Sequence, residues 1–161
     1  MKRFLLTLVL GASTVLSAQT SEGFTSGPVF AGCDTTAGSK AAISCMQQAI
    51  FRHIGQNFII PKVERDALHA KTAAWKALPR GERKNTPEPV LNGRIYITFY
   101  VEIDGSLGEV EVSKVTGELM KETQEAGIEV VKSLPPFQRP AYEAGKPVRQ
   151  RLTIPISVRV M

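Results

Sequence analysis

The residues of this sequence that could take part in chemistry are two cysteines, two histidines and scattered carboxylates. Cys33 and Cys45 are the two cysteines of the chain, and they lack the C-x-x-C spacing that is typical of a zinc ligand pair. No second ligand pair accompanies them, so we expect no metal site. An oxidising compartment would join the two thiols, and we therefore predict a Cys33–Cys45 disulfide; two free thiols are the alternative.

The histidines and carboxylates do not form a recognisable catalytic pattern. His53 lies within a predicted helix, where a structural role is expected, and His69 lies in a polar region, where we expect it to be solvated. Glu109 and Glu111 project from the same face of one strand, whereas acid–base catalysis needs carboxylates that converge in a cleft. No nucleophile elbow, H-E-x-x-H motif or phosphate-binding glycine loop is present. We expect no catalytic residue, no cofactor and no enzyme.

Composition and charge are those of an ordinary globular domain. The chain has 161 residues, of which 43% are apolar and 22% charged, and this length suits one domain with a short appendage. The formal net charge of +5 is mild, and the basic residues are spread along the sequence. No basic run is interleaved with aromatic residues, so nucleic-acid binding has little support.

The N-terminus has the pattern of an export signal, which we place at residues 1–18. Lys2-Arg3 forms a charged start, and a short apolar stretch then leads to small residues that end at Ala18. A membrane-spanning helix needs about 20 apolar residues, and polar residues interrupt this shorter stretch. We therefore predict a cleaved signal over a retained anchor, a periplasmic location, and a flexible lead-in over residues 19–28.

The first half of the mature chain has one clear helical pattern and one ambiguous region. Apolar residues at helical spacing predict a helix from about Ser39 to Asn57. The residues of its apolar face are Ile43, Met46, Ile50, Ile54 and Phe58. Residues 62–91 form an insert that has an alanine-rich candidate helix over 66–78, followed by a polar, proline-punctuated loop. Trp75 is expected to be a packing anchor of this insert.

The second half alternates as strands do. Residues 94–103 and 108–115 predict a hairpin that turns at Asp104-Gly105. The residues expected to face the core are Ile95, Ile97, Phe99, Val101 and Ile103. A helix over 118–134 follows, and a last strand over 148–160 completes the pattern. The predicted fold class is α+β, with two main helices packed on one face of a small, about three-stranded antiparallel sheet.

Three segments of the sequence, in this order and spacing, resemble the C-terminal domain of TonB-type energy transducers. The segments are Gly93–Gly105 with Val110-Glu-Val, Val130-Val-Lys-Ser-Leu-Pro-Pro-Phe, and Gly145-Lys-Pro-Val-Arg leading into Leu152-Thr-Ile-Pro-Ile. A further segment from Pro28 to Phe58 is similar to the lead-in of TonB-like proteins of Bacteroidetes. The resemblance divides the chain into residues 29–91, with the first helix, the disulfide loop and the insert, and a TonB C-terminal-like domain over 92–161.

The resemblance implies a non-enzymatic periplasmic domain that binds partners by β-strand addition, in which main-chain hydrogen bonds supply affinity. The expected partners are segments of outer-membrane TonB-dependent receptors or other envelope proteins. The edge strand that the resemblance assigns to binding contains Leu152, Thr153, Ile154, Ile156, Ser157, Val158, Arg159 and Val160. Pro155 supports an edge position, because proline cannot donate to a strand ladder. Protection of that edge against aggregation is the alternative interpretation of Pro155.

Two differences from the family bear on function. Family members carry a membrane anchor and a long proline-rich spacer, whereas the predicted lead-in here extends only about 35 Å. The insert over 62–91 is also longer than the usual link between the first helix and the hairpin. A second hypothesis is therefore a structural envelope protein that uses the same fold to bind cell-wall material or another subunit. The open sheet edge also allows a homodimer.

Overall fold

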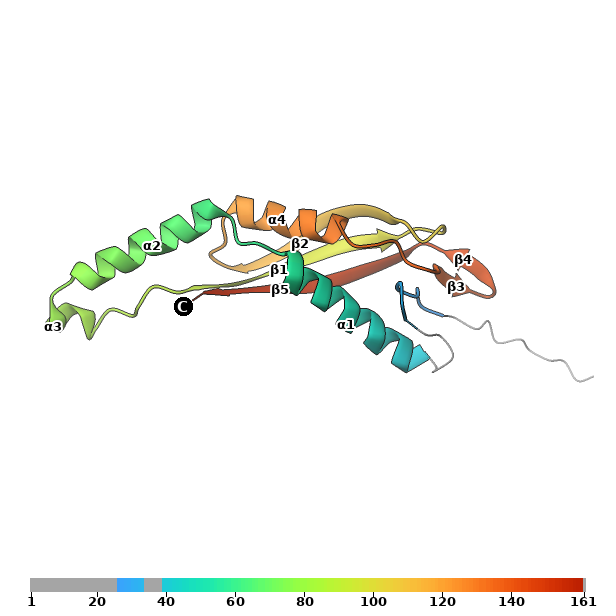
Figure 1. Ribbon diagram of the computed structural model, residues 1–161, viewed down its shortest axis with the longest axis horizontal. Coiled ribbons are helices and arrows are strands. Elements are labelled where there is room, and N and C mark those ends of the chain that lie inside the picture. Colours follow the sequence, from blue (N-terminus) through green and yellow to red (C-terminus); the bar gives the residue numbers. More distant parts are fainter. Residues whose placement is uncertain (1–25, 34–38, 161) are drawn as a thin grey trace, which may run out of the picture.

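The structure of the protein is a computed structural model that describes residues 26–33 and 39–160. The predicted export signal and most of the predicted lead-in lie outside these residues. The elements are α1 (Ser39–Asn57), α2 (Lys62–Ala77), α3 (Arg80–Arg83), β1 (Leu91–Val101), β2 (Leu107–Gly117), α4 (Lys121–Lys132), β3 (Ala141–Glu143), β4 (Lys146–Val148) and β5 (Gln150–Val160). The predicted α+β class is confirmed (Figure 1). Within the described ranges, no helix is long and apolar enough to cross a membrane.

The main sheet has three antiparallel strands in the order β2-β1-β5, so β1 is central and the two other strands are edges. The β1–β5 register runs without a shift from Leu91↔Val160 to Val101↔Gln150. The β1–β2 register is shifted at two places, between Tyr96 and Ile97 and between Phe99 and Tyr100. The predicted sheet is therefore confirmed, and its two edges differ in regularity.

The hairpin turn between β1 and β2 forms where the Asp104-Gly105 signal predicts it. The Asp104 carboxylate accepts hydrogen bonds from the hydroxyl of Ser106 (2.6 Å) and from its backbone N–H (2.9 Å), and these bonds hold the pKa of Asp104 below its usual 3.8. Gly105 has a φ of +84°, a conformation that favours glycine. Ile103 was predicted to face the core, but this prediction is wrong. Because β1 ends at Val101, Ile103 lies in the turn and is 61% exposed.

One face of the sheet carries the hydrophobic core. The core residues contributed by the sheet include Ile95, Ile97, Phe99, Val101, Ile154, Ile156 and Val158. Helix α4 covers this face through Val130 and Val131, and the close approach is possible because Gly127 lies over β1. A Cβ atom at Gly127 would lie 3.0 Å from a methyl group of Ile97. The face opposite the core carries the polar positions of β1 and β5.

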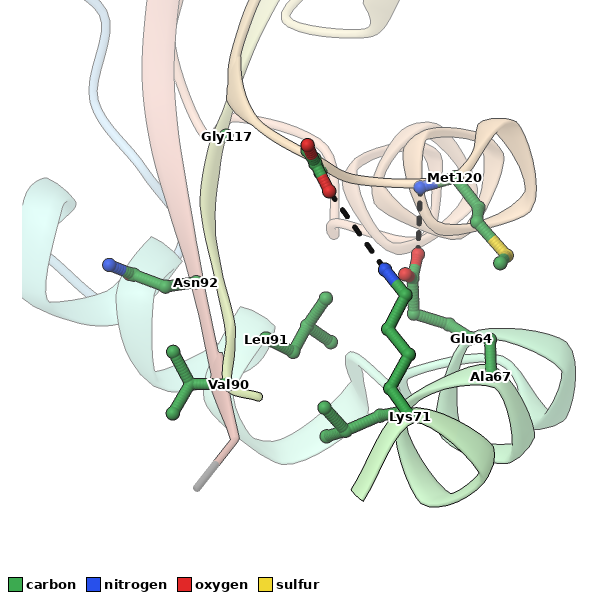
Figure 2. Close-up of a pocket in the computed structure, with 10 residues that line it drawn as sticks. Glu64, Ala67, Lys71, Val90, Leu91, Asn92, Gly117 and Met120 are labelled. Carbon is green, nitrogen blue, oxygen red and sulfur yellow. Dashed lines mark hydrogen bonds and ion pairs between the residues drawn. The ribbon is translucent and has the colours of Figure 1, made fainter. Parts of the chain in front are cut away.

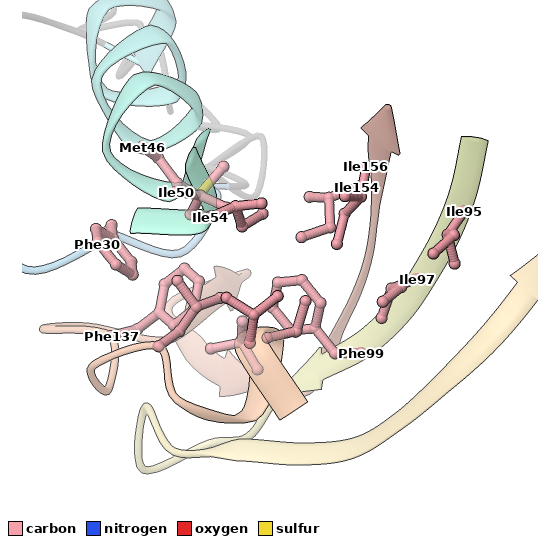
Figure 3. Packing of buried hydrophobic residues seen from close by; sticks show 14 of the residues in the cluster. Phe30, Met46, Ile50, Ile54, Ile95, Ile97, Phe99, Phe137, Ile154 and Ile156 are labelled. Atoms are coloured by element: carbon pink, nitrogen blue, oxygen red, sulfur yellow. The ribbon is translucent and has the colours of Figure 1, made fainter. Parts of the chain in front are cut away.

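Helix α1 adds a second patch to the same core. Met46, Ile50 and Ile54 of α1 point into the core, and Ile54 faces Ile154 and Ile156 of β5 (Figure 3). Phe30, Phe99 and Phe137 form an aromatic cluster in the same core. The rings of Phe30 and Phe137 meet edge to face, with centroids 5.2 Å apart. The bounds predicted for this helix are confirmed. Its predicted apolar face is wrong at the N-terminal end, since Ile43 is 46% exposed.

A short hairpin, β3–β4, was not predicted, and it pairs with the start of the described chain. Ser26 and Tyr142 exchange two backbone hydrogen bonds of 2.9 and 2.8 Å, and the Val29 N–H donates to the Arg139 carbonyl. Ser26, which the sequence places in the lead-in, therefore pairs with the folded domain. The predicted disulfide is confirmed: Cys33 and Cys45 are bonded, with Cα atoms 5.8 Å apart, and tie this segment to α1.

The insert forms an arm at the opposite end of the molecule, where α2 and α3 extend beyond the sheet (Figure 1). The indole N–H of Trp75 donates to the Thr86 carbonyl at 2.8 Å, and the Arg83 guanidinium lies over the indole ring. Trp75 is thus a packing anchor, as predicted. The arm joins the domain through Glu64, whose buried carboxylate accepts hydrogen bonds from the Met120 N–H (2.8 Å) and the Thr123 hydroxyl (2.6 Å).

Candidate functional site

The free edge of β5 is the site that the sequence predicts for binding. In the described part of the chain, β5 pairs with β1 on one side and with no strand on the other. Pro155 lies opposite Tyr96. Because proline has no N–H, Tyr96 and Pro155 form a non-hydrogen-bonded pair of the antiparallel ladder. Because such pairs alternate with bonded pairs, the backbone N–H groups of Thr153 and Ser157 also point away from β1, toward the free edge.

The side chains of the predicted binding strand divide between its two faces. Ile154, Ile156 and Val158 are buried in the core, and Leu152 and Val160 are half-buried against it. Thr153, Ser157 and Arg159 are exposed on the polar face. The Thr153 hydroxyl lies 2.9 Å from that of Thr98, and the Arg94 guanidinium donates to the Ser157 hydroxyl at 3.2 Å. What the edge can offer a partner is therefore mainly its backbone.

A groove runs beside this edge, between β5 and the C-terminal half of α1. Its volume is about 450 Å³, and its lining residues are Phe51, Ile54, Gly55, Phe58, Arg94, Pro155, Ile156 and Ser157. Phe51 is 46% exposed although it is a large apolar residue. Sequence reasoning assigned no binding role to α1. Phe51 could have indicated such a role, because it is an aromatic residue outside the predicted apolar face that contains Met46, Ile50 and Ile54.

The other edge of the sheet is less suited to receive a strand. The two register shifts of β2 are irregularities that disrupt the ladder and bend the strand. Exposed charged residues, Glu109, Glu111 and Lys114, also follow this strand. Bulges and charges are the common means by which proteins prevent pairing at an edge. β5 has a straight register over eleven residues and carries only Pro155 as a comparable feature within its central part.

Of the two histidines, one makes a structural contact and the other is exposed. His53 Nε2 lies 2.9 Å from the Ser133 hydroxyl and so links α1 to the end of α4. His69 is exposed on α2. The hydrogen bond from Lys62, together with the charges of Lys62 and Arg65, lowers the pKa of Asp66 from its usual 3.8. Among residues 26–33 and 39–160, no cluster of three or more His, Cys, Asp or Glu is placed to hold a metal ion.

A second cavity, of about 340 Å³, lies where α2 meets the ends of β1 and β2 (Figure 2). Its charged groups, Glu64, Lys71 and Glu118, already have partners. The Glu64 carboxylate points to the backbone N–H of Met120, and the ammonium of Lys71 lies 3.9 Å from the carboxylate of Glu118. These contacts join the arm to α4 and to the segment that precedes it, which explains the charged lining of this cavity.

Comparison with known proteins gave one structural likeness. No family model matches the chain, and no curated protein matches it. The structure is similar to the NMR solution structure of the Helicobacter pylori TonB C-terminal domain, with 18% sequence identity and a TM-score of 0.33; the match covers 63% of this chain and 85% of the other. We draw no functional conclusion from a likeness of this extent.

Proposed function

We propose that this chain is a non-enzymatic binding domain that takes an extended segment of a partner protein as an additional strand beside β5. The observation that carries the proposal is the combination of an unpaired, unbulged edge strand with an apolar groove next to it. A visiting strand would bond to the outward-facing backbone of Thr153 and Ser157. Strand addition of this kind takes its affinity from main-chain hydrogen bonds and its specificity from alternate side chains.

The groove supplies the side-chain specificity. Successive side chains of a strand point to opposite faces of the sheet. Every second side chain of an added strand would therefore lie on the same face as Ile154 and Ile156, where α1 borders the edge. Phe51 and Phe58 line that position and present aromatic surface. We expect the partner segment to carry apolar residues at alternate positions, with polar residues between them.

The compartment and the class of partner follow from other features. A Cys33–Cys45 disulfide favours a location outside the cytoplasm. The export pattern of residues 1–18 agrees with secretion to the periplasm. The three sequence segments that resemble the TonB C-terminal domain favour envelope proteins as partners, and N-terminal periplasmic segments of outer-membrane TonB-dependent receptors are the first to test.

The test is an NMR titration of the ¹⁵N-labelled, disulfide-linked protein with synthetic peptides of such receptor segments. We expect the amides of Thr153, Ser157 and their neighbours on β5 to shift. Ser157→Pro removes one outward N–H and should weaken binding, whereas Ser157→Ala keeps that N–H and should bind as the native protein does. Unchanged β5 amides at millimolar peptide, or equal binding by both variants, would contradict the proposal.

A further inference from the structure

A cavity on the arm lies at the end of the proposed binding edge. It has a volume of about 290 Å³ and is lined by Arg65, Leu68, His69, Thr72, Lys76, Glu88, Pro89 and Val160. Val160 is the last residue of β5, so the cavity begins where this strand ends. Positions 65, 69, 72 and 76 are three or four residues apart, which places them along one side of α2.

This side of α2 is the one nearer to β5. The cavity of Figure 2 includes Ala67 and Lys71 of α2, and it contacts Gly117 at the end of β2. The cavity at Val160 lies on the adjacent side of the same helix, and Leu68 lines both cavities. Since β2 and β5 are the two opposite edges of the sheet, α2 presents one side to each edge. Arg65, His69 and Lys76, which we name the basic stripe, thus lie in line with the β5 edge.

Charge is concentrated on the arm. Residues 62–84 contain seven Lys or Arg and three Asp or Glu, a net of +4 out of the +5 of the whole chain. Lys62 and Lys71 form ion pairs with Asp66 and Glu118. Arg65 and Lys76 form no ion pair with any residue in the described ranges. Both side chains are exposed, and Glu88 is the acidic residue that lines the same cavity.

We propose that the basic stripe binds a carboxylate of the same partner segment that adds beside β5. This inference rests on the proposed function and narrows it to an extended segment with an acidic end. Five residue steps separate Pro155, at the groove, from Val160, at the cavity, which is about 17 Å along a strand. The partner would therefore carry Asp or Glu about five to seven positions from the apolar residue that occupies the groove between α1 and β5.

The arrangement has a kinetic consequence. A cluster of like charges attracts an oppositely charged segment over roughly one Debye length, about 8 Å at physiological ionic strength. Such attraction raises the association rate more than it lowers the dissociation rate. The apolar groove and the backbone of β5 would then hold the segment after the basic stripe has captured its acidic end. Affinity for an acidic segment should fall as salt rises, and affinity for its amide analogue should not.

The experiment uses a phage-displayed library of random dodecapeptides, panned on the disulfide-linked protein. The same library is panned on the double variant Arg65→Gln/Lys76→Gln and on a control, Lys121→Gln/Lys132→Gln, which removes two exposed charges from α4. We expect native protein and control to select alternating apolar peptides with Asp or Glu at the predicted distance. The arm variant should select the apolar pattern without the acid.

Synthetic peptides from the selection then give the affinities. An acidic peptide should bind the arm variant about fivefold to tenfold more weakly than the native protein, as expected for two exposed ion pairs. Its Asp→Asn analogue should bind both equally. Peptides that shift β5 amides but show no acidic preference would overturn this inference and leave the proposed strand addition intact. Acidic peptides that shift only the amides of α2 would also overturn it. A selection without any β5 binder would overturn the proposed function itself.

Discussion

Glu64 shows how a single side chain connects the arm to the domain. It lies in the first turn of α2 and is 5% exposed, an unusual position for a carboxylate. Its oxygen accepts hydrogen bonds at the N-terminus of α4, where Met120 provides no side-chain cap of its own. Backbone N–H groups at a helix N-terminus lack intrahelical partners and favour negative charge. Glu64 therefore caps α4 from another helix.

We predict that Glu64→Ala lowers the free energy of unfolding by about 2 kcal/mol, which is the usual size of a lost cap together with an unsatisfied buried hydroxyl. The Met120 N–H and the Thr123 hydroxyl would both lose their acceptor. Urea unfolding followed by circular dichroism measures the change. Glu118→Ala is the matched control, because this carboxylate is 95% exposed and lies 3.9 Å from Lys71. An equal loss in both variants would contradict the capping role.

The sequence could not predict this contact, although it predicted other residues well. Glu64 and Met120 are 56 positions apart, and no local pattern joins them. By contrast, the alternation of Ile95, Ile97 and Phe99 is a local signal, and all three are fully buried. Local periodicity thus identifies which side chains enter the core, while polar contacts between distant elements depend on the tertiary fold.

The same distinction holds for whole elements. Strand alternation and helical periodicity predicted α1, β1, β2, α4 and β5 to within a few residues. The β3–β4 hairpin escaped prediction because its strands have three residues each, too few to show a period. The groove beside β5 also escaped, since it needs α1 and the edge strand side by side. Sequence reasoning therefore predicted both the edge strand and α1, but not that α1 borders this edge.

Helix α1 is held by its buried apolar residues, by the contact between His53 and Ser133 and by one covalent link, the disulfide. Replacing both cysteines by serine should lower the free energy of unfolding by about 3 kcal/mol, the chain-entropy value for a loop of this size. Denaturant midpoints of the Cys33→Ser/Cys45→Ser variant measure the change, and the reduced native protein serves as the control. We also expect weaker peptide binding, because a loosened α1 would disturb the groove. An unchanged midpoint would show that the α1 contacts with the core suffice.

At the scale of the whole molecule, the two ends of the sheet carry different attachments. The β3–β4 hairpin and the disulfide-linked segment lie at one end, and the arm lies at the other (Figure 1). The β5 edge runs between them, with the groove at its middle and the basic stripe at its C-terminal end. An added strand would therefore lie against apolar surface at the middle of the edge and against positive charge at the C-terminal end of β5. The positions of the groove and the basic stripe would therefore determine in which orientation a partner segment binds along β5.

Pro155 decides whether this edge is open to other strands or guarded against them. Pro155→Thr restores one outward N–H, whose net hydrogen bond is worth about 1 kcal/mol, so peptide affinity should rise about fivefold. The same variant should favour self-association through β5, because an edge without proline pairs more readily. Isothermal titration and analytical ultracentrifugation measure the two effects.

Pro147→Thr on β4 is the control, since β4 belongs to the separate two-stranded sheet. If neither affinity nor association changes, the N–H at position 155 does not face the free edge. If association alone rises, Pro155 protects the edge and the partner uses another surface.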